Sequence, residues 1–401
     1  MLGQLKAIPP DPILGILAAF AQDSNPLKID LGIGVYRDEH GHTPMLRSVI
    51  EAEKQMIARQ NTKSYLGPSG VPGFNSAMSN LIFGEASETL AQGRIRTVQT
   101  PGGTGALRLA AELIKAANPT ARVWASSPTW PNHLAIFPAP GLVMESYPYF
   151  DPASSSLCFD DMLAALRLRG PGDTVLFHAC CHNPCGVSPT PAQWESISEV
   201  AAERGFLPLV DFAYQGFERS IDEDNLAVRL FAQKCQELIV TSSCSKNFAV
   251  YRDRVGAISV VAGDARKAAD IETVIHALTR RNYSMPPAHG PAVIDILLHS
   301  AELTALWRTE VQAMCRRING LRDELVQKIR ARGINREFSF LQRQTGMFSF
   351  LGLDVEQVRR LRQEFSIYTV DSARVNIASF NTANIDYFVA ALAKVLEDPG
   401  C

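Results

Sequence analysis

The chain has 401 residues, 46% of them hydrophobic and 20% charged, with a formal net charge of −2. It is long enough to bury a large core, and its near-neutral charge gives no field that would attract nucleic acid or an anionic membrane surface. We therefore expect its partners to be small molecules and a second copy of itself.

The N-terminal segment MLGQLKAIPPDPILGILAAF, residues 1–20, contains an apolar run too short to span a bilayer, and no small-residue cleavage pattern follows it. This pattern predicts a cytoplasmic protein that does not insert into membranes. Eight cysteines in a chain of this length, without a secretion signal, indicate reduced thiols rather than a disulfide framework.

Between residues 100 and 262, apolar or β-branched runs alternate with helix-like segments, which is typical of an α/β protein with a mostly parallel sheet. The runs show little polar alternation, as strands covered on both faces do. We predict strands at 122–126, 174–179, 207–213, 237–243 and 255–261. We predict helices at 105–118 and 190–205, the second opening with Thr190 as its cap and Pro191 at its first position.

Residues 302–333 carry apolar side chains at spacings of three, four and five, which predicts one long amphipathic helix. The sequence after it alternates short apolar runs with helical patterns and reads as a smaller α+β unit. The chain thus predicts a large α/β domain followed by a smaller domain.

A glycine-rich turn, QTPGGTG at 99–105, runs directly into the predicted helix at 105–118. Backbone N–H groups and the positive end of a helix dipole can cradle a phosphate there. Glycines also serve plain tight turns, so this loop alone leaves both interpretations open. It lacks the G-x-G-x-x-G of dinucleotide folds and the trailing Gly-Lys-Ser/Thr of a P-loop.

The cluster HACCHNPCG at 178–186 places two histidines and three cysteines close together. Zinc ribbons and fingers need a second, well-separated ligand pair, and the sequence offers none here. We interpret these residues as buried thiols near a polar turn and expect no metal.

Polar side chains gather where the predicted strands end, at the edge where parallel α/β sheets bind ligands. They are His178, Asn183, Asp211, Tyr214, Ser243 and Lys246. A carboxylate at the end of an apolar strand is costly unless it meets a positive charge, so Asp211 requires a cationic partner. Taken alone, Asp211 could equally cap a helix and Tyr214 belong to the core.

Lys246 ends a buried strand among small hydroxyl residues, and Arg254 follows eight positions later. Such a lysine is an anion ligand, a nucleophile, or both. Pyridoxal phosphate requires a lysine for a Schiff base, an acid for its pyridine nitrogen, donors for its ring hydroxyl, and a phosphate nest. All four occur here, which favours this cofactor.

Six motifs stand in a fixed order along the chain: Gly102-Gly103-Thr104-Gly105, Trp130-Pro131-Asn132-His133, His182-Asn183-Pro184, Asp211-Phe212-Ala213-Tyr214, Ser243-Cys244-Ser245-Lys246 and Arg254-Val255-Gly256. In this order they resemble the class I aspartate and aromatic amino acid aminotransferases. The resemblance continues through NYSMPPAHG, GMFSF and ARVN, and extends from residue 11 nearly to the end of the chain.

The resemblance implies the fold type I architecture of aminotransferases. It has a large domain, whose mostly parallel seven-stranded sheet is flanked by helices, and a smaller α+β domain. It also implies the domain boundaries: an N-terminal arm at 1–11, a small domain at 12–42 and 314–401, and a large cofactor-binding domain at 43–313.

For the cofactor, the resemblance implies that Lys246 forms the Schiff base and then moves the proton from the substrate Cα. Asp211 would pair with the ring nitrogen, while Asn183 and Tyr214 would hydrogen-bond the ring oxygen. Trp130 would stack on the ring.

The same resemblance places the cofactor phosphate against Gly103, Thr104, Ser243 and Arg254. Tyr65 would reach it from a neighbouring subunit. This arrangement implies a homodimer with shared active sites.

For the substrate, the resemblance implies that Arg374 grips the α-carboxylate and that Arg280, from the partner chain, binds a distal carboxylate. Gly34 would form the wall of the small domain that closes over the substrate, where Trp130 and Asn183 also lie. The reaction implied is ping-pong transfer of an amino group between an L-amino acid and 2-oxoglutarate.

Departures from the aspartate-selective pattern occur at Ser64, Arg281 and Met285. Ser64 and Met285, in place of small amides, make the pocket less polar, so we favour an aromatic amino acid aminotransferase with dual specificity. The alternatives are a strict aspartate aminotransferase and a secondary-metabolism transaminase for an unusual amino acid. Cys185, Ala373 and Ser379 also depart from the family pattern, and bear on fine geometry rather than on chemistry.

Two rival functions are weaker. A dinucleotide-dependent dehydrogenase lacks its glycine fingerprint and leaves Lys246 unexplained. A non-catalytic regulator derived from an aminotransferase is disfavoured because every chemical position is filled and no helix-turn-helix precedes residue 11.

Overall fold

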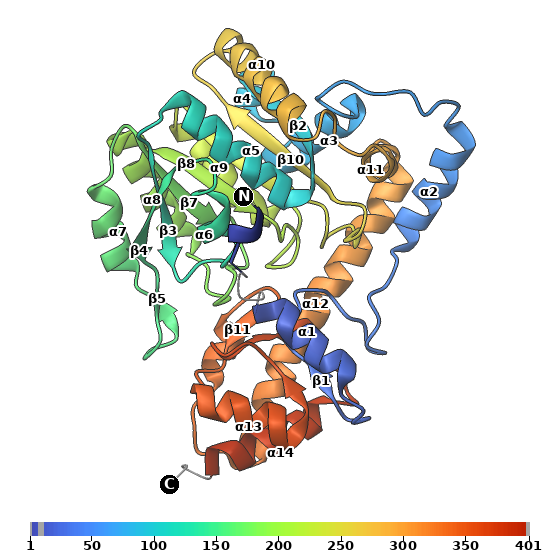
Figure 1. The fold of residues 1–401 in the computed structure, drawn as a ribbon, viewed down its shortest axis with the longest axis vertical. Helices are drawn as coiled ribbons and strands as arrows, with labels where there is room; N and C mark the ends of the chain where they lie inside the picture. Colours follow the sequence, from blue (N-terminus) through green and yellow to red (C-terminus); the bar gives the residue numbers. More distant parts are fainter. Residues whose placement is uncertain (1, 7–11, 398–401) are drawn as a thin grey trace. The chain divides into compact units, whose positions relative to one another are not determined.

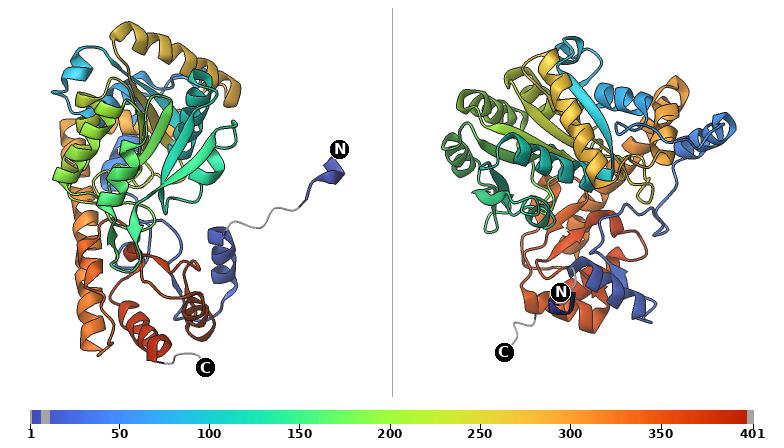
Figure 2. Two further views of the ribbon diagram at one scale, coloured as in Figure 1. Left: turned by 90° about the vertical axis from the view of Figure 1, so that its left-hand side faces the viewer. Right: turned by 45° about the horizontal axis from the view of Figure 1, so that its top comes forward.

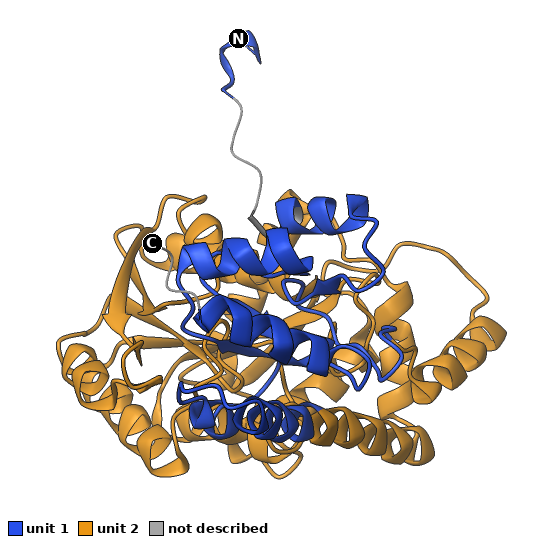
Figure 3. Ribbon diagram, turned by 90° about the horizontal axis from the view of Figure 1, so that it is seen from below, with its two compact units in different colours: residues 1–43, 318–401 blue, residues 44–317 orange. Residues whose placement is uncertain are grey.

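The structure is a computed structural model that describes residues 2–6 and 12–397. Of the N-terminal arm expected over residues 1–11, residues 1 and 7–11 lie outside the described part. The chain divides into two compact units, residues 1–43 with 318–401 and residues 44–317 (Figure 3). We call them unit 1 and unit 2.

Unit 2 is built on a seven-stranded sheet with the order β2-β10-β9-β8-β7-β3-β4 (Figure 1). Its strands are β2 (Ile95–Pro101), β3 (Arg122–Ser127), β4 (Val143–Pro148), β7 (Asp173–His178), β8 (Leu207–Phe212), β9 (Leu238–Ser243) and β10 (Val255–Val261). In this sheet β10 runs in the direction opposite to the other six strands. The mostly parallel sheet predicted from the sequence is confirmed, and so are its five predicted strands.

Helices cover both faces of this sheet (Figure 2). The helices of unit 2 that precede α12 (Ala301–Ala331) are α2 (Arg47–Arg59), α3 (Pro72–Phe83), α4 (Glu88–Ala91), α5 (Gly102–Ala117), α6 (His133–Ile136), α7 (Phe159–Arg167), α8 (Pro191–Arg204), α9 (Leu226–Lys234), α10 (Ala265–Asn282) and α11 (His289–Leu298), of which α2 packs on α11. A short 3-10 turn, Glu223–Asn225, and a small hairpin, β5 (Phe150–Asp151) with β6 (Ser156–Leu157), complete the unit.

The apolar core of unit 2 lies between the sheet and helices α5, α6 and α10. Leu107 and Ala110 of α5 are buried against Leu176 and Leu209 of the central strands. On the other face, Phe177 packs its ring against Trp194 of α8 and Phe231 of α9. Because both faces are covered, the strands have the nearly continuous apolar sequences from which they were predicted.

Local signals in the sequence set the helix ends. Thr190 caps α8 in a capping box with Gln193, as its sequence predicts, and Gly205 ends the helix at a φ of 70°. The long helix predicted at 302–333 is α12 (Ala301–Ala331), and the boundary between the units falls within it.

Unit 1 contains a 3-10 turn at Leu2–Gln4, then α1 (Pro12–Gln22), β1 (Ile29–Asp30), the end of α12, a 3-10 turn at Ser339–Arg343, β11 (Phe348–Phe350), α13 (Val355–Phe365), β12 (Ile367–Tyr368), β13 (Arg374–Asn376), a 3-10 turn at Ile377–Ser379 and α14 (Ile385–Glu397). Strands β1 and β12 pair in parallel, and β11 and β13 pair antiparallel. This is the smaller α+β unit expected from the sequence.

The seven described cysteines are all free thiols, as expected, and the eighth, Cys401, lies outside the described residues. No helix within the described residues combines the length and the hydrophobicity that crossing a membrane requires.

Candidate active site

The carboxyl ends of β2, β3, β7, β8 and β9 meet at one edge of the sheet, together with the start of β10. In the register of these strands, Asp211 lies beside His178 on β7, and Gly256 of β10 lies beside Ser243 of β9. The side chains predicted at the strand ends are therefore brought together by the sheet itself.

The N-terminus of α5 forms the end of this site that suits an anion. Gly102 has a φ of +74°, and a Cβ there would stand 2.6 Å from Nη2 of Arg254. A Cβ on Gly256 would stand 2.6 Å from the backbone carbon of Gly102, and one on Gly103 would meet Ser243 at 3.0 Å. Glycines thus let the guanidinium and β9 approach the first turn of the helix, where the backbone N–H groups are unpaired.

Arg254 has no carboxylate partner among the described residues. Its guanidinium donates only weak contacts, to Oγ of Ser245 at 3.4 Å and to the carbonyl of Tyr251 at 3.2 Å. A guanidinium beside the positive end of a 16-residue helix is a binding site for an anion.

Asp211, at the end of β8, is buried and accepts a hydrogen bond at Oδ2 from Nε2 of His133 at 3.1 Å. Burial alone would raise the pKa of Asp211, but the hydrogen bond and charge of His133, together with His178 and Lys246, outweigh burial and lower it. Its other oxygen, Oδ1, has no hydrogen-bond partner in the described part of the chain. An ionised acceptor therefore faces the site.

His133 is held in turn by Thr129, whose hydroxyl lies 2.9 Å from Nδ1 of His133 and 3.2 Å from Nε2 of His178. Burial lowers the pKa of His178 to about 3, so this ring stays neutral at physiological pH. The sequence interpretation assigned no role to His133 or Thr129. His133 appeared there only as the last residue of the motif that begins at Trp130.

Lys246 follows β9 and is partly buried. Its Nζ lies 5.2 Å from the centre of the Tyr214 ring and forms no ion pair or hydrogen bond with any described residue. Burial is the main cause that lowers its pKa to about 8; Asp211 opposes this effect and Arg254 adds to it. At neutral pH a useful fraction of this amine is uncharged and nucleophilic.

Four more predicted residues lie in the same unit. Asn183 and Tyr214 are buried, on the loops that follow β7 and β8. Trp130 lies in the turn after β3, with its ring perpendicular to that of His133 at 5.2 Å. Thr104 is exposed in the first turn of α5.

Four other predicted residues are not part of the cluster at the strand ends of unit 2. Tyr65 is 93% exposed, and Arg280, at the end of α10, is exposed and donates a hydrogen bond to Ser284. Gly34 and Arg374 belong to unit 1, where Nη2 of Arg374 donates to the carbonyl of Gly32 at 2.6 Å.

The departures noted in the sequence occupy particular positions. Cys185 is fully buried, with its Sγ 3.1 Å from Nδ1 of His182. Burial raises the pKa of this thiol to about 12, so it is not a nucleophile. Ala373 adopts a left-handed φ of +57°, which glycine would take more readily, and Ser379 is buried.

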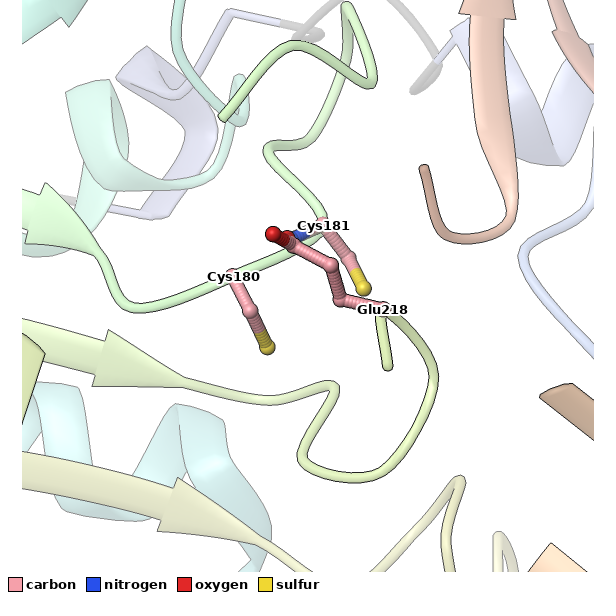
Figure 4. Close-up of side chains that lie close together, drawn as sticks. All are labelled: Cys180, Cys181 and Glu218. Carbon is pink, nitrogen blue, oxygen red and sulfur yellow. The ribbon is translucent and has the colours of Figure 1, made fainter. Parts of the chain in front are cut away.

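A group that resembles a metal-ligand set lies beside the site: Cys180, Cys181 and Glu218 have their potential ligand atoms within 4.8 Å of one another (Figure 4). Glu218 comes from a loop that the sequence analysis did not connect with this cluster. Its Oε2 accepts from the Cys181 amide at 2.9 Å and from the Ser188 hydroxyl at 2.6 Å. Burial raises the pKa of both thiols, and the carboxylate already ties two loops together.

Comparison with known proteins agrees with this geometry. The family described as "Aminotransferase class I and II" matches residues 26–392. The chain is 46% identical to an aspartate aminotransferase of Salmonella typhi over 99% of this chain and all of that protein. It is 45% identical to an aromatic-amino-acid aminotransferase of Pseudomonas aeruginosa over 98% and 99%.

A solved structure of an aromatic-amino-acid aminotransferase from Burkholderia pseudomallei, covalently bound to pyridoxal phosphate, superposes with a TM-score of 0.97. It is 43% identical and is covered over 99% of both chains. The fold and the full-length identity agree with the motifs at the sheet edge, and the chain belongs to the class I and II aminotransferases.

Proposed function

We propose that the protein is a pyridoxal-phosphate-dependent aminotransferase that moves an amino group between an aromatic L-amino acid or aspartate and 2-oxoglutarate. The observation that carries this proposal is the pairing of an amine whose pKa is lowered to about 8, Lys246, with a buried and ionised carboxylate, Asp211, at one edge of the sheet. A lysine and an aspartate exposed to solvent would show neither of these pKa shifts.

The donor set fits this cofactor at both of its ends. Oδ1 of Asp211 is an ionised acceptor with no described partner, as a protonated ring nitrogen requires. Arg254 and the first turn of α5, with Gly103, Thr104 and Ser243, fit a phosphate. Asn183 and Tyr214 would hold the ring oxygen, and Trp130 would cover the ring face.

Pyridoxal phosphate, when bound, supplies an aldehyde that captures amino groups and a ring that draws electrons from the substrate Cα. The chain supplies the rest. His133 keeps Asp211 ionised and oriented toward the ring. Lys246 holds a proton at Nζ or releases it near neutral pH, which matches the demands of a base that would take a proton from the substrate Cα and deliver it to C4′ of the cofactor.

For the substrate, we propose that Arg374 binds the α-carboxylate and Arg280 the distal carboxylate, with Gly34 forming the wall above them. Relatives of nearly equal identity carry the names aspartate and aromatic-amino-acid aminotransferase, which supports dual specificity over strict aspartate specificity. Met285 and Ser64 support the same choice, because they place less polar groups near the segment of Arg280.

We propose that unit 1 and unit 2 act as the small and large domains, and that two copies form a homodimer with shared sites. Tyr65 supports the dimer: it is 93% exposed and lines a cavity of about 790 Å³ between residues 56–72 and residues 285–296. A tyrosine this exposed can serve as a phosphate ligand only where it contacts the site of another chain. The free thiols of the described residues support a reducing compartment, the cytoplasm.

The first experiment is a panel of amino donors with 2-oxoglutarate as acceptor, compared by kcat/KM. We expect activity with aspartate and with aromatic amino acids. Lys246→Ala should abolish turnover while cofactor binding persists, since the ring and phosphate contacts remain. Full activity in Lys246→Ala would refute the assignment.

The dimer is tested by mixing subunits. Lys246→Ala and Arg280→Leu inactivate different halves of a shared site, so a heterodimer of the two carries one intact site. Dicarboxylate turnover should reappear after the two inactive variants are denatured and refolded together. If the mixture stays inactive while heterodimers form, the sites are not shared.

A further inference from the structure

Arg322 lies in the part of α12 that belongs to unit 1 and is only 1% exposed. Its guanidinium donates five hydrogen bonds to the segment 341–349. Nη1 donates to the carbonyl of Leu341 at 3.2 Å and to Oγ of Ser349 at 2.6 Å. Nη2 donates to the carbonyls of Thr345 at 3.1 Å, Gly346 at 2.7 Å and Phe348 at 2.9 Å. A buried charge is tolerated only when it is hydrogen-bonded in this way, so the segment is fixed around it.

The segment that Arg322 fixes ends in β11, which carries Phe348. The ring of Phe348 lies under Arg374, with the guanidinium carbon 4.4 Å from the ring centre. It also lies under Gly34, where an added Cβ would stand 2.9 Å from Cζ of the ring. In the β11–β13 ladder Phe350 is opposite Arg374, so Phe348 lies two residues away on the same face of the pair.

The segment 31–35 is attached to the same framework. Nη2 of Arg374 donates to the carbonyl of Gly32 at 2.6 Å, and Nδ2 of Asn376 donates to the carbonyls of Ile33 at 2.8 Å and Val35 at 2.7 Å. Arg374 and Gly34 thus share one support, the ring of Phe348, and this ring has its backbone fixed by Arg322.

We propose that Arg322 is a positioning residue for the α-carboxylate grip: it sets the place of Phe348, and through Phe348 the place of Arg374. This inference rests on the proposed role of Arg374 in binding the α-carboxylate. Lysine cannot replace Arg322, because the ammonium has three donors and lacks the planar fork that reaches five acceptors.

The test measures binding of 3-indolepropionate, a monocarboxylate without an amino group, to the holoenzyme through the absorbance of the bound cofactor. Because a displacement of about 1 Å can cost up to ~100-fold in a positioned site, we expect Arg322→Lys to weaken this binding about tenfold or more. The cofactor spectrum and affinity should not change, since the proposed cofactor ligands belong to unit 2.

A double-mutant cycle separates positioning from general destabilisation. If Arg322 acts through Phe348, then Arg322→Lys adds little to the loss caused by Phe348→Leu. Val395→Ala, a fully buried change on α14 of the same unit, is the matched control and should leave binding unchanged. Should Arg322→Lys fail to fold, Ser349→Ala removes one of its five acceptors and should weaken binding severalfold.

Normal binding in folded Arg322→Lys, normal binding in Ser349→Ala, or fully additive losses in the cycle would overturn the inference. Arg374→Lys distinguishes this failure from a failure of the proposed function. If Arg374→Lys loses 3-indolepropionate and the Arg322 variants do not, only the positioning role is wrong. If Arg374→Lys binds normally, the proposed α-carboxylate site itself is wrong.

Discussion

The charge state of Lys246 in the cofactor-free protein tests the electrostatics of the site directly. Burial lowers the pKa of this amine from an ordinary 10.5 to about 8. A tenfold change in proton affinity corresponds to about 1.4 kcal/mol, so keeping Lys246 protonated in the folded protein costs about 3 kcal/mol at pH 7. The folded apoprotein therefore contains a built-in destabilising charge.

Lys246→Met removes this charge, and we expect the variant apoprotein to be more stable than the wild type by up to about 3 kcal/mol at pH 7. Between pH 8 and 10.5 the unfolded wild-type chain binds more protons than the folded chain, so wild-type stability rises with pH. The advantage of the variant should fall away over this same window.

Urea unfolding of the two apoproteins at several pH values between 7 and 10.5 measures this difference. Lys267→Met, which changes an exposed lysine on α10, controls for general effects of removing a positive charge. A stability gain for Lys246→Met that is absent at pH 7, or that stays constant up to pH 10.5, would contradict the lowered pKa.

Three further outcomes follow from particular contacts. Gly256→Ala should lower stability by about 1–3 kcal/mol and weaken cofactor binding, because its Cβ would stand 2.6 Å from backbone atoms of Gly102 and Ser242; Gly263→Ala, with open space around it, is the control for urea unfolding and cofactor titration. Ala373→Gly should raise the free energy of unfolding in urea by roughly 0.5–1 kcal/mol, because position 373 has a φ of +57°; an unchanged free energy of unfolding would contradict strain there. Arg280→Leu should reduce kcat/KM for aspartate far more than for phenylalanine, and equal losses would remove its proposed role.

The strand ends that carry the site were predictable because the central strands are covered on both faces and read as apolar runs. Strand β2 was not predicted, although it leads into the glycine turn. Its polar residues are buried in pairs: Thr97 Oγ1 lies 2.7 Å from the Ser79 hydroxyl and 2.8 Å from that of Ser259. Such hydrogen bonds between distant segments make a polar strand stable, and no local pattern reveals them.

The partner of Asp211 was only partly predictable. The sequence required a positive group near a buried carboxylate, and the resemblance implied that the ring nitrogen of the cofactor is that group. The structure adds His133, which forms the hydrogen bond, and Thr129 behind it. These residues follow β3, two strands away from β8 in the sheet, so their contact depends on strand order rather than on spacing along the chain.

The two units divide the proposed chemistry in a way that bears on substrate range. The lowered pKa of Lys246 arises from burial and from Arg254, and Asp211 opposes it; these residues all lie within unit 2. The proposed α-carboxylate grip depends on Arg374, Phe348 and Arg322, all within unit 1. Arg280 and Met285 lie in unit 2, so changes around them that alter the range of accepted side chains leave the residues of the proposed α-carboxylate grip in place. This separation agrees with the nearly equal identity of this chain to relatives named for aspartate and for aromatic amino acids.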